Sequence, residues 1–213
     1  MPVHEIALRR VVYELPGMRS VPVREDESMR IYGANDDAPL VIILDGLPDD
    51  RFAARVGCRF MDMEWTISMA QLLAASGFTA ITHSARDPQA DALALIAQLR
   101  GCGRKIGIWA TSGHGPVALL AAARADCAVL TNPITKDFCP DTPLFIGRSG
   151  KDETAGLNAA LDAFTARAMA ENKPLTLVNY PEAPHAFELN LDTVDTRRIL
   201  DQAIAFLRLY LAA

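Results

Sequence analysis

The sequence predicts an α/β fold with a mostly parallel, doubly wound sheet and helices on both of its faces. Three observations support this. From residue 40 onward, short apolar runs alternate with helix-like segments, which is typical of parallel strands joined by right-handed crossovers. The apolar runs are continuous, as expected for strands covered on both faces. The chain has 213 residues, half of them apolar, so we expect a single domain over residues 1–213.

The predicted elements follow in chain order. Six strands are expected, at residues 40–44, 78–82, 105–111, 127–130, 144–146 and 175–178. The first predicted helix, 65–75, is closed by Gly77, and the second begins where Asp87 precedes Pro88 and ends at Gly101. Further helices are expected over 117–125 and 157–171, and from residue 192 or 193 toward the C-terminus. Within residues 1–35, the segments 7–14 and 29–32 are predicted to be antiparallel edge strands.

Ser112 lies where a strand pattern stops and a helix pattern begins. It follows the apolar run 105–111 and precedes Gly113, His114 and Gly115. A tight turn from strand to helix lifts a hydroxyl above the edge of the sheet. It also brings that hydroxyl to a helix N-terminus, where backbone N–H groups can stabilise an oxyanion. Ser112 is therefore a candidate nucleophile, although a serine in such a turn is often only a helix cap.

An acid and a histidine follow Ser112, each just past a predicted strand. Asp152 comes after the strand at 144–146, and His185 comes after the strand at 175–178. Loops beyond the carboxyl ends of parallel strands meet at one crevice, so the three side chains can converge. Glu153, Asp137 and Asp141 remain alternative acids.

The chain resembles the α/β-hydrolase superfamily, and within it the small dienelactone hydrolase-like proteins. The resemblance runs from about residue 40 to the end, and its most specific parts are the segments 106–112, 150–153 and 184–187. The order serine, acid, histidine is that of the superfamily. The family elbow is Gly-x-nucleophile-x-Gly, whereas Ala110 and His114 occupy the two glycine positions here. Dienelactone hydrolases use cysteine, so the serine favours the broader esterase-like group.

The resemblance also implies the rest of the site. The backbone N–H groups of Leu47 and Gly113 would form the oxyanion hole, although Asp45-Gly46 stands where relatives often carry His-Gly. Flanking Gly113 and Gly115 are expected to adopt unusual backbone angles and so relieve crowding by His114. A cap, where relatives have one, is commonly inserted between residues 130 and 144, and this gap is too short for one. Candidate pocket residues, each with an alternative structural role, are His83, His114, Met61 and Trp65.

Composition narrows the possible partners and location. The net charge is −5, which argues against nucleic acid, and no apolar stretch approaches membrane-spanning length. The start of the chain lacks the pattern of a signal peptide, and four scattered cysteines show no metal-ligand spacing, so we expect a cytoplasmic protein. The expected mechanism requires neither metal nor organic cofactor, and a homodimer is left open.

These features predict a serine hydrolase that cleaves small soluble esters or lactones through an acyl-enzyme. Ser112 would attack, His185 would act as base, and Asp152 would orient the imidazole. Two alternatives are retained. The first is a non-catalytic ligand-binding protein on the same scaffold, because fold does not settle function and His114 alters the elbow. The second is a small serine peptidase or acyltransferase.

Overall fold

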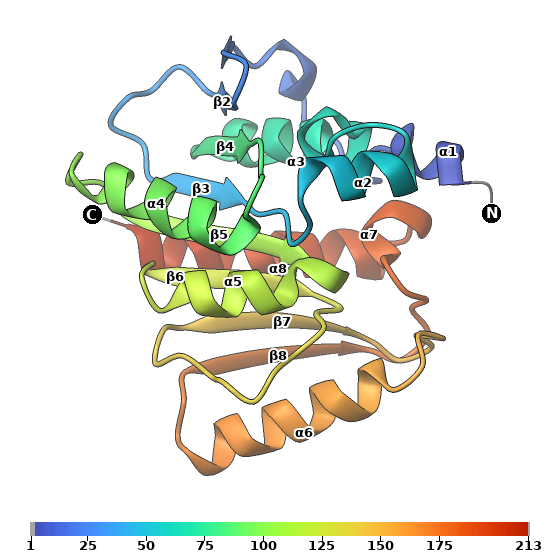
Figure 1. Ribbon diagram of the computed structural model, residues 1–213. Coiled ribbons are helices and arrows are strands. Elements are labelled where there is room, and N and C mark those ends of the chain that lie inside the picture. Colours follow the sequence, from blue (N-terminus) through green and yellow to red (C-terminus); the bar gives the residue numbers. More distant parts are fainter. Residues whose placement is uncertain (1–2, 213) are drawn as a thin grey trace.

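A single eight-stranded sheet runs through the protein (Figure 1). The computed structural model describes residues 3–212. The strands are β1 (Val23–Glu25), β2 (Met29–Tyr32), β3 (Leu40–Ile43), β4 (Thr79–His83), β5 (Ile106–Thr111), β6 (Cys127–Thr131), β7 (Leu144–Ser149) and β8 (Leu175–Tyr180). Their spatial order is β1-β2-β4-β3-β5-β6-β7-β8. In this spatial order, every pairing from β4 through β3 to β8 is parallel, so the carboxyl ends of these six strands lie at one edge of the sheet.

The N-terminal part of the chain differs from its prediction. The segment 29–32 is β2, which pairs antiparallel with β4 as expected of an edge region. The segment 7–14 is not a strand: it follows the short helix α1 (Val3–Ala7) and forms no regular element. The outer strand is instead β1, which pairs antiparallel with β2. All three residues of β1 are exposed, so it has no buried face and leaves no apolar alternation in the sequence.

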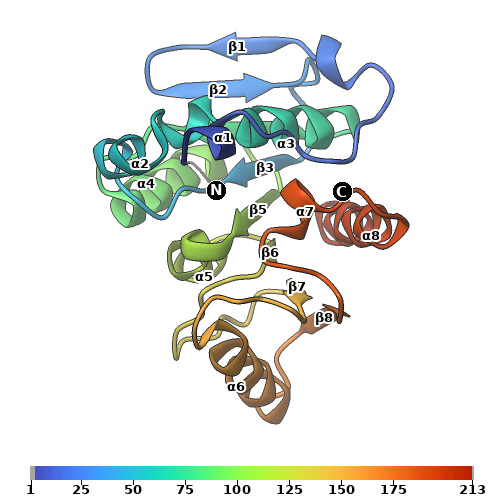
Figure 2. The ribbon, with the colours of Figure 1, turned by 90° about the vertical axis from the view of Figure 1, so that its right-hand side faces the viewer.

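Helices cover both faces of the sheet. The larger ones are α2 (Asp49–Val56), α3 (Glu64–Ala75), α4 (Pro88–Arg100), α5 (Gly115–Ala122), α6 (Leu157–Ala170) and α8 (Val194–Leu211). Figure 2 shows α4 and α5 on one side of the sheet and α8 on the other. The predicted helix starts are confirmed at two caps: the Asp87 side chain accepts from the Ala90 amide, and the Thr193 hydroxyl accepts from the Thr196 amide.

Alternate residues of the buried strands pack into two separate hydrophobic cores, one on each face of the sheet. In β3, Val41 and Ile43 face α3, α8 and the N-terminal segment, whereas Leu40 and Ile42 face α4, α5 and α6. All four of these side chains are at most 1% exposed. The continuous apolar runs in the sequence therefore reflect strands buried on both faces.

Between β6 and β7, residues 132–143 form no helix or strand, so no folded cap is inserted there. Within the described part of the chain, none of the helices has the length and apolar character required to span a bilayer.

Candidate active site

The turn after β5 holds Ser112 in a strained backbone conformation. Its φ is +48°, in the left-handed region that residues with side chains rarely adopt. Such a conformation costs about 1–3 kcal/mol and persists only where the surroundings enforce it. Here the Ser112 carbonyl accepts from the Ile134 amide (2.9 Å), which ties the turn to the loop after β6. The short 3₁₀ helix η3 (Ser112–His114) and α5 follow directly.

Two glycines permit the close packing of this elbow. A Cβ on Gly115 would lie 2.4 Å from the Ile134 carbonyl oxygen, so only glycine fits where α5 begins. A Cβ on Gly46 would lie 2.7 Å from the His114 Cα and 2.8 Å from the Gly113 oxygen. His114 itself has an ordinary helical conformation (φ −82°, ψ −11°). The expected relief through unusual backbone angles at Gly113 and Gly115 is wrong, because neither glycine has a positive φ. Close packing requires glycine at positions 46 and 115 instead.

His185 reaches Ser112 from the loop after β8. Its Nε2 atom lies 2.8 Å from the Ser112 Oγ, so the hydroxyl can donate to the imidazole. The loop is held at both sides: the Pro184 carbonyl accepts from the Ser149 hydroxyl (2.8 Å), and the buried Phe187 opens the short helix α7 (Phe187–Asn190). The Asn190 amide group donates to the His185 carbonyl (3.1 Å). These contacts fix the ring beside the elbow.

Asp152 lies on the other side of the imidazole. Its Oδ2 atom is 2.6 Å from His185 Nδ1, and its side chain has no exposed surface. Burial by itself would raise the Asp152 pKa, but hydrogen bonds from His185 and from the Thr154 amide outweigh it, and the pKa is lowered. The carboxylate is therefore held in its charged form, which keeps the Nδ1 proton in place and leaves Nε2 as the acceptor for Ser112.

The alternative acids lie elsewhere. Asp141 is an exposed partner of Lys173 (2.6 Å), and Asp137 is an exposed partner of Arg167 (3.7 Å). Glu153 is also exposed. The structure therefore brings together Ser112, His185 and Asp152 among the sequence candidates, and leaves the three other carboxylates away from the imidazole.

The two expected oxyanion donors differ in their surroundings. The Gly113 amide lies in the first turn of η3, where backbone N–H groups lack an intrahelical acceptor. The Leu47 amide donates to the Oδ1 atom of Asp45, at 2.9 Å. An oxyanion received by Leu47 would share this N–H with a carboxylate oxygen.

Glu188 is a component of the site that the sequence analysis missed. This fully buried carboxyl accepts from the Thr111 hydroxyl (2.9 Å) and from the Thr131 hydroxyl (2.8 Å), both through Oε1. Burial raises the pKa of Glu188. Thr111 immediately precedes Ser112, and Glu188 follows His185 by three residues. The carboxyl thus joins the ends of β5 and β6 to the histidine loop. Only the threonines at two predicted strand ends could have pointed to it.

The expected pocket residues need correction. Met61 and Trp65 are at most 1% exposed, so their side chains belong to the interior. His83 is also buried, with Nδ1 3.0 Å from the Ser84 carbonyl oxygen. His114 is buried against the rings of Phe52 and Phe60. These four residues are buried and do not present a broad surface to a ligand.

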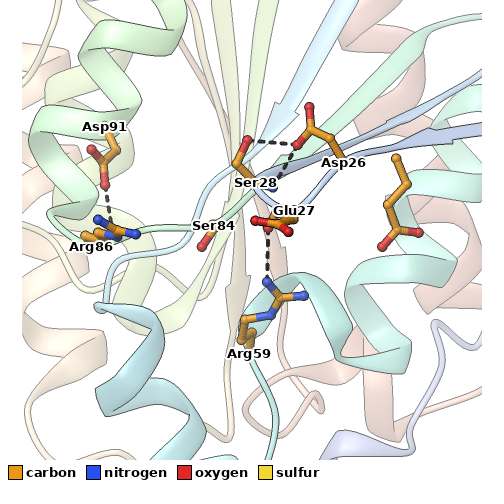
Figure 3. Close-up of a pocket in the computed structure, with 8 residues that line it drawn as sticks. Asp26, Glu27, Ser28, Arg59, Ser84, Arg86 and Asp91 are labelled. Atoms are coloured by element: carbon orange, nitrogen blue, oxygen red, sulfur yellow. Dashed lines mark hydrogen bonds between the residues drawn. The ribbon is translucent and has the colours of Figure 1, made fainter.

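A separate charged hollow opens beside the β1–β2 hairpin (Figure 3). Its volume is about 910 Å³, and it contains none of the three residues Ser112, His185 and Asp152. It is lined by Glu25, Asp26, Glu27, Ser28, Arg59, Ser84, Arg86 and Asp91. Several of these groups already bond to one another, such as the Asp26 carboxylate with the Ser28 hydroxyl (2.8 Å). Within residues 3–212, no group of three or more His, Cys, Asp or Glu side chains is arranged to hold a metal ion.

No protein-family model matches the chain, and no curated protein matches its sequence. Solved structures do match. The native form of esterase 2 from Thermogutta terrifontis is 17% identical with a TM-score of 0.65, and the alignment covers 98% of each chain. Its butyrate-bound form is 17% identical with a TM-score of 0.61, covering 92% of this chain and 97% of that one. EstE1, a carboxylesterase cloned from a metagenomic library, is 14% identical with a TM-score of 0.71, covering 99% and 96%.

At these identities the similarity concerns the fold. The eight-stranded, mostly parallel sheet and the match over nearly the whole chain confirm the predicted α/β-hydrolase fold.

Proposed function

We propose that the protein is a serine hydrolase that cleaves small esters or lactones. The observation that carries the proposal is the continuous hydrogen-bond chain from the Ser112 Oγ through the His185 imidazole to Asp152, with distances of 2.8 Å and 2.6 Å. This hydrogen-bond chain starts at Ser112, which lies beside a helix N-terminus and has a strained backbone. Backbone strain of this kind tends to mark functional sites. Nucleophile, base and orienting acid in this geometry are the requirements of acyl transfer.

In the first half of the reaction, His185 Nε2 takes the proton of Ser112 as Oγ bonds to the substrate carbonyl carbon. The carbonyl π electrons move to oxygen and form a tetrahedral oxyanion. When the oxyanion collapses, the bond to the leaving alkoxide breaks, and the imidazolium returns its proton to that oxygen. A free alcohol leaves from an ester, whereas from a lactone the alcohol stays attached to the acyl group.

In the second half, water replaces serine as the nucleophile. His185 removes a proton from the water as the water oxygen bonds to the acyl carbon. When this second tetrahedral intermediate collapses, the bond from the acyl carbon to the Ser112 Oγ breaks, the imidazolium returns its proton to Oγ, and a carboxylic acid is released. The amides of Gly113 and Leu47 are the proposed oxyanion donors, and a donor of this kind contributes roughly 3–4 kcal/mol to the transition state. Asp152 stays ionised throughout and stabilises the imidazolium.

Three observations support a small substrate. Residues 132–143 form no folded cap over the site, and Met61 and Trp65 are buried in the interior. The butyrate-bound structure of the T. terrifontis esterase shows a short carboxylate on the same fold.

The dienelactone hydrolase-like type belongs to this proposal and rests on the segments 106–112, 150–153 and 184–187. We also propose a cytoplasmic location, which the four free cysteines support.

The decisive experiment compares Ser112→Ala with Ser20→Ala, a matched change at an exposed serine. A fluorophosphonate should label the wild type and the Ser20 variant at Ser112 and should not label the Ser112 variant. Hydrolysis of p-nitrophenyl acetate should fall by at least about 1,000-fold in Ser112→Ala, with the melting temperature unchanged. Activity retained in that variant would refute the proposal.

The same experiment separates the alternatives. A ligand-binding protein without catalysis would give neither labelling nor hydrolysis. A peptidase or acyltransferase would be labelled at Ser112 but would prefer amides, or an acceptor alcohol, over water.

A further inference from the structure

Two unusual positions in this chain contact each other. Asp45-Gly46 follows β3 where the family resemblance leads one to expect His-Gly, and His114 occupies the second glycine position of the elbow. In the structure, the Gly46 amide donates to His114 Nδ1 at 2.7 Å. The Asp45 Oδ1 atom lies 3.0 Å from the same nitrogen, but Nδ1 cannot donate to it while it accepts from Gly46, and Oδ1 instead accepts from the Leu47 amide.

The contact is buried and tightly packed. The Asp45 side chain has no exposed surface, and that of His114 is 11% exposed. The imidazole lies against Phe60, with ring centroids 4.6 Å apart, and near Phe52 at 6.1 Å. A hydrogen bond in such a setting is strong, because water cannot compete for either partner. The ring therefore has a fixed position relative to both the elbow and the loop.

We name residues 45–47 the oxyanion loop. Its backbone passes so close to the elbow that a Cβ on Gly46 would collide with the His114 Cα at 2.7 Å. At this point of closest approach, the His114 ring bonds to the Gly46 amide, one peptide unit before the Leu47 amide. The Leu47 amide is in turn directed by Asp45 Oδ1, at 2.9 Å. The position of the Leu47 N–H thus depends on Asp45 and His114 together.

We propose that His114 is a positioning residue that ties the oxyanion loop to the nucleophile elbow through the Gly46 amide. The inference rests on the proposed function, because its consequence is a fixed spacing between the Gly113 and Leu47 amides that receive the oxyanion. Two donors stabilise one oxygen only when both lie within hydrogen-bond distance of it. A displacement of about 1 Å at such a site can cost on the order of 100-fold in rate.

The test uses two substitutions that separate the hydrogen-bond acceptor of His114 from the apolar contacts of its ring. In His114→Asn, the side-chain oxygen can take the place of Nδ1 as acceptor for the Gly46 amide, but the ring is lost. In His114→Leu, the apolar contact with Phe52 and Phe60 is kept, but the acceptor is lost. We expect kcat to fall roughly 10–100-fold in His114→Leu and less than about threefold in His114→Asn, with KM changed less than about threefold in both.

Two further measurements address the mechanism. The affinity of a trifluoromethyl ketone, which binds as a tetrahedral oxyanion, should fall in step with kcat in His114→Leu, whereas the affinity of the product acid should not change. Amide hydrogen exchange at Gly46 should become at least about tenfold faster in His114→Leu and stay near the wild-type rate in His114→Asn, because only the acceptor protects this N–H.

The exchange measurement does not require activity, so the two proposals can fail separately. If the wild type hydrolyses no ester but Gly46 exchange follows the expected pattern, the tie through Gly46 is upheld and the proposed function is wrong. If the enzyme is active and His114→Leu has the wild-type kcat or the wild-type exchange rate at Gly46, the positioning role is overturned. Equal losses of kcat in both variants would also overturn it, since the ring and not the acceptor would then matter.

Discussion

At the scale of single residues, the site depends on two buried carboxyls with opposite electrostatic behaviour. Asp152 has a lowered pKa because the imidazole and the Thr154 amide donate to it, in spite of its burial. Glu188 has a raised pKa because burial outweighs the two threonine hydroxyls that donate to it. Its Oε2 atom is buried without a hydrogen-bond partner. The surroundings of Asp152 thus favour its charged form, whereas burial raises the pKa of Glu188, which joins strand ends.

The raised pKa of Glu188 predicts a specific pH dependence of stability. A carboxyl whose pKa is higher in the folded state binds more protons there, so its contribution is complete below the usual value near 4.5 and is lost as pH rises through the folded pKa. Glu188→Gln keeps an oxygen acceptor for both threonines and does not titrate. Relative to this variant, the wild type should lose stability as pH rises above about 4.5, at up to about 1.4 kcal/mol per pH unit, until Glu188 is ionised in the folded protein.

Urea unfolding of the two proteins at each pH measures this difference. His185 is the ionisable neighbour that acts electrostatically on Glu188, so the series should be repeated in a His185→Gln background. Glu153→Gln, at an exposed carboxyl, is the control and should show a nearly constant difference from the wild type. The same constancy in Glu188→Gln would mean that Glu188 has an ordinary pKa.

At the scale of elements, the junction between β5 and α5 determines where the proposed nucleophile Ser112 lies. The strand is buried at every position, and the helix starts so close to the loop after β6 that Gly115 has no room for a side chain. The Ile134 amide bonds to the Ser112 carbonyl in the same region. The strained turn is therefore enforced from the β6 side, and it does not depend on glycine at position 113.

This packing predicts different effects for two neighbouring glycines. Gly115→Ala would place a Cβ 2.4 Å from the Ile134 oxygen, so the helix or the loop must move, at a cost of about 1–3 kcal/mol. Gly113→Ala places its Cβ in open space and keeps the amide, so its stability should stay within about 0.5 kcal/mol of the wild type. Denaturant unfolding distinguishes the two, and equal effects would show that close packing at residue 115 is not the determinant.

At the scale of the whole molecule, the parallel strands bring distant residues to one edge. Ser112, Asp152 and His185 follow β5, β7 and β8, and the oxyanion loop follows β3. The segment 132–143, between β6 and β7, forms no helix or strand, so no folded cap covers this edge of the sheet. The walls available to an acyl chain are therefore those of the loops themselves.

The open edge predicts a preference for short acyl chains. Each buried methylene contributes about 0.8 kcal/mol, but only where an apolar wall covers it. We expect kcat/KM for p-nitrophenyl esters to be highest for acetyl or butyryl groups and to fall for longer chains, without activation at a lipid interface. A series from two to sixteen carbons measures this, and a steady rise toward the longest chains would contradict it.

The sequence by itself determined the parallel part of the sheet, and it predicted the three residues of the proposed triad, which lie within hydrogen-bond distance of one another. Both are local signals: buried strands form continuous apolar runs, and chemically active residues follow directly after them. The edge strand β1 had no such signal, because all its residues are exposed. The segment 7–14 contains apolar residues that suggested a strand, but it forms none in the structure.

Only the tertiary structure decided which residues support the site. Met61 and Trp65 lie in the interior, because burial depends on what the other elements cover and not on the local pattern. The contact of His114 with Asp45 and Gly46, and that of Glu188 with Thr111 and Thr131, join segments separated by 57 to 77 positions in the chain. Such pairs leave no periodicity in the sequence, since they arise from the order of strands in the sheet and from the distance between their ends.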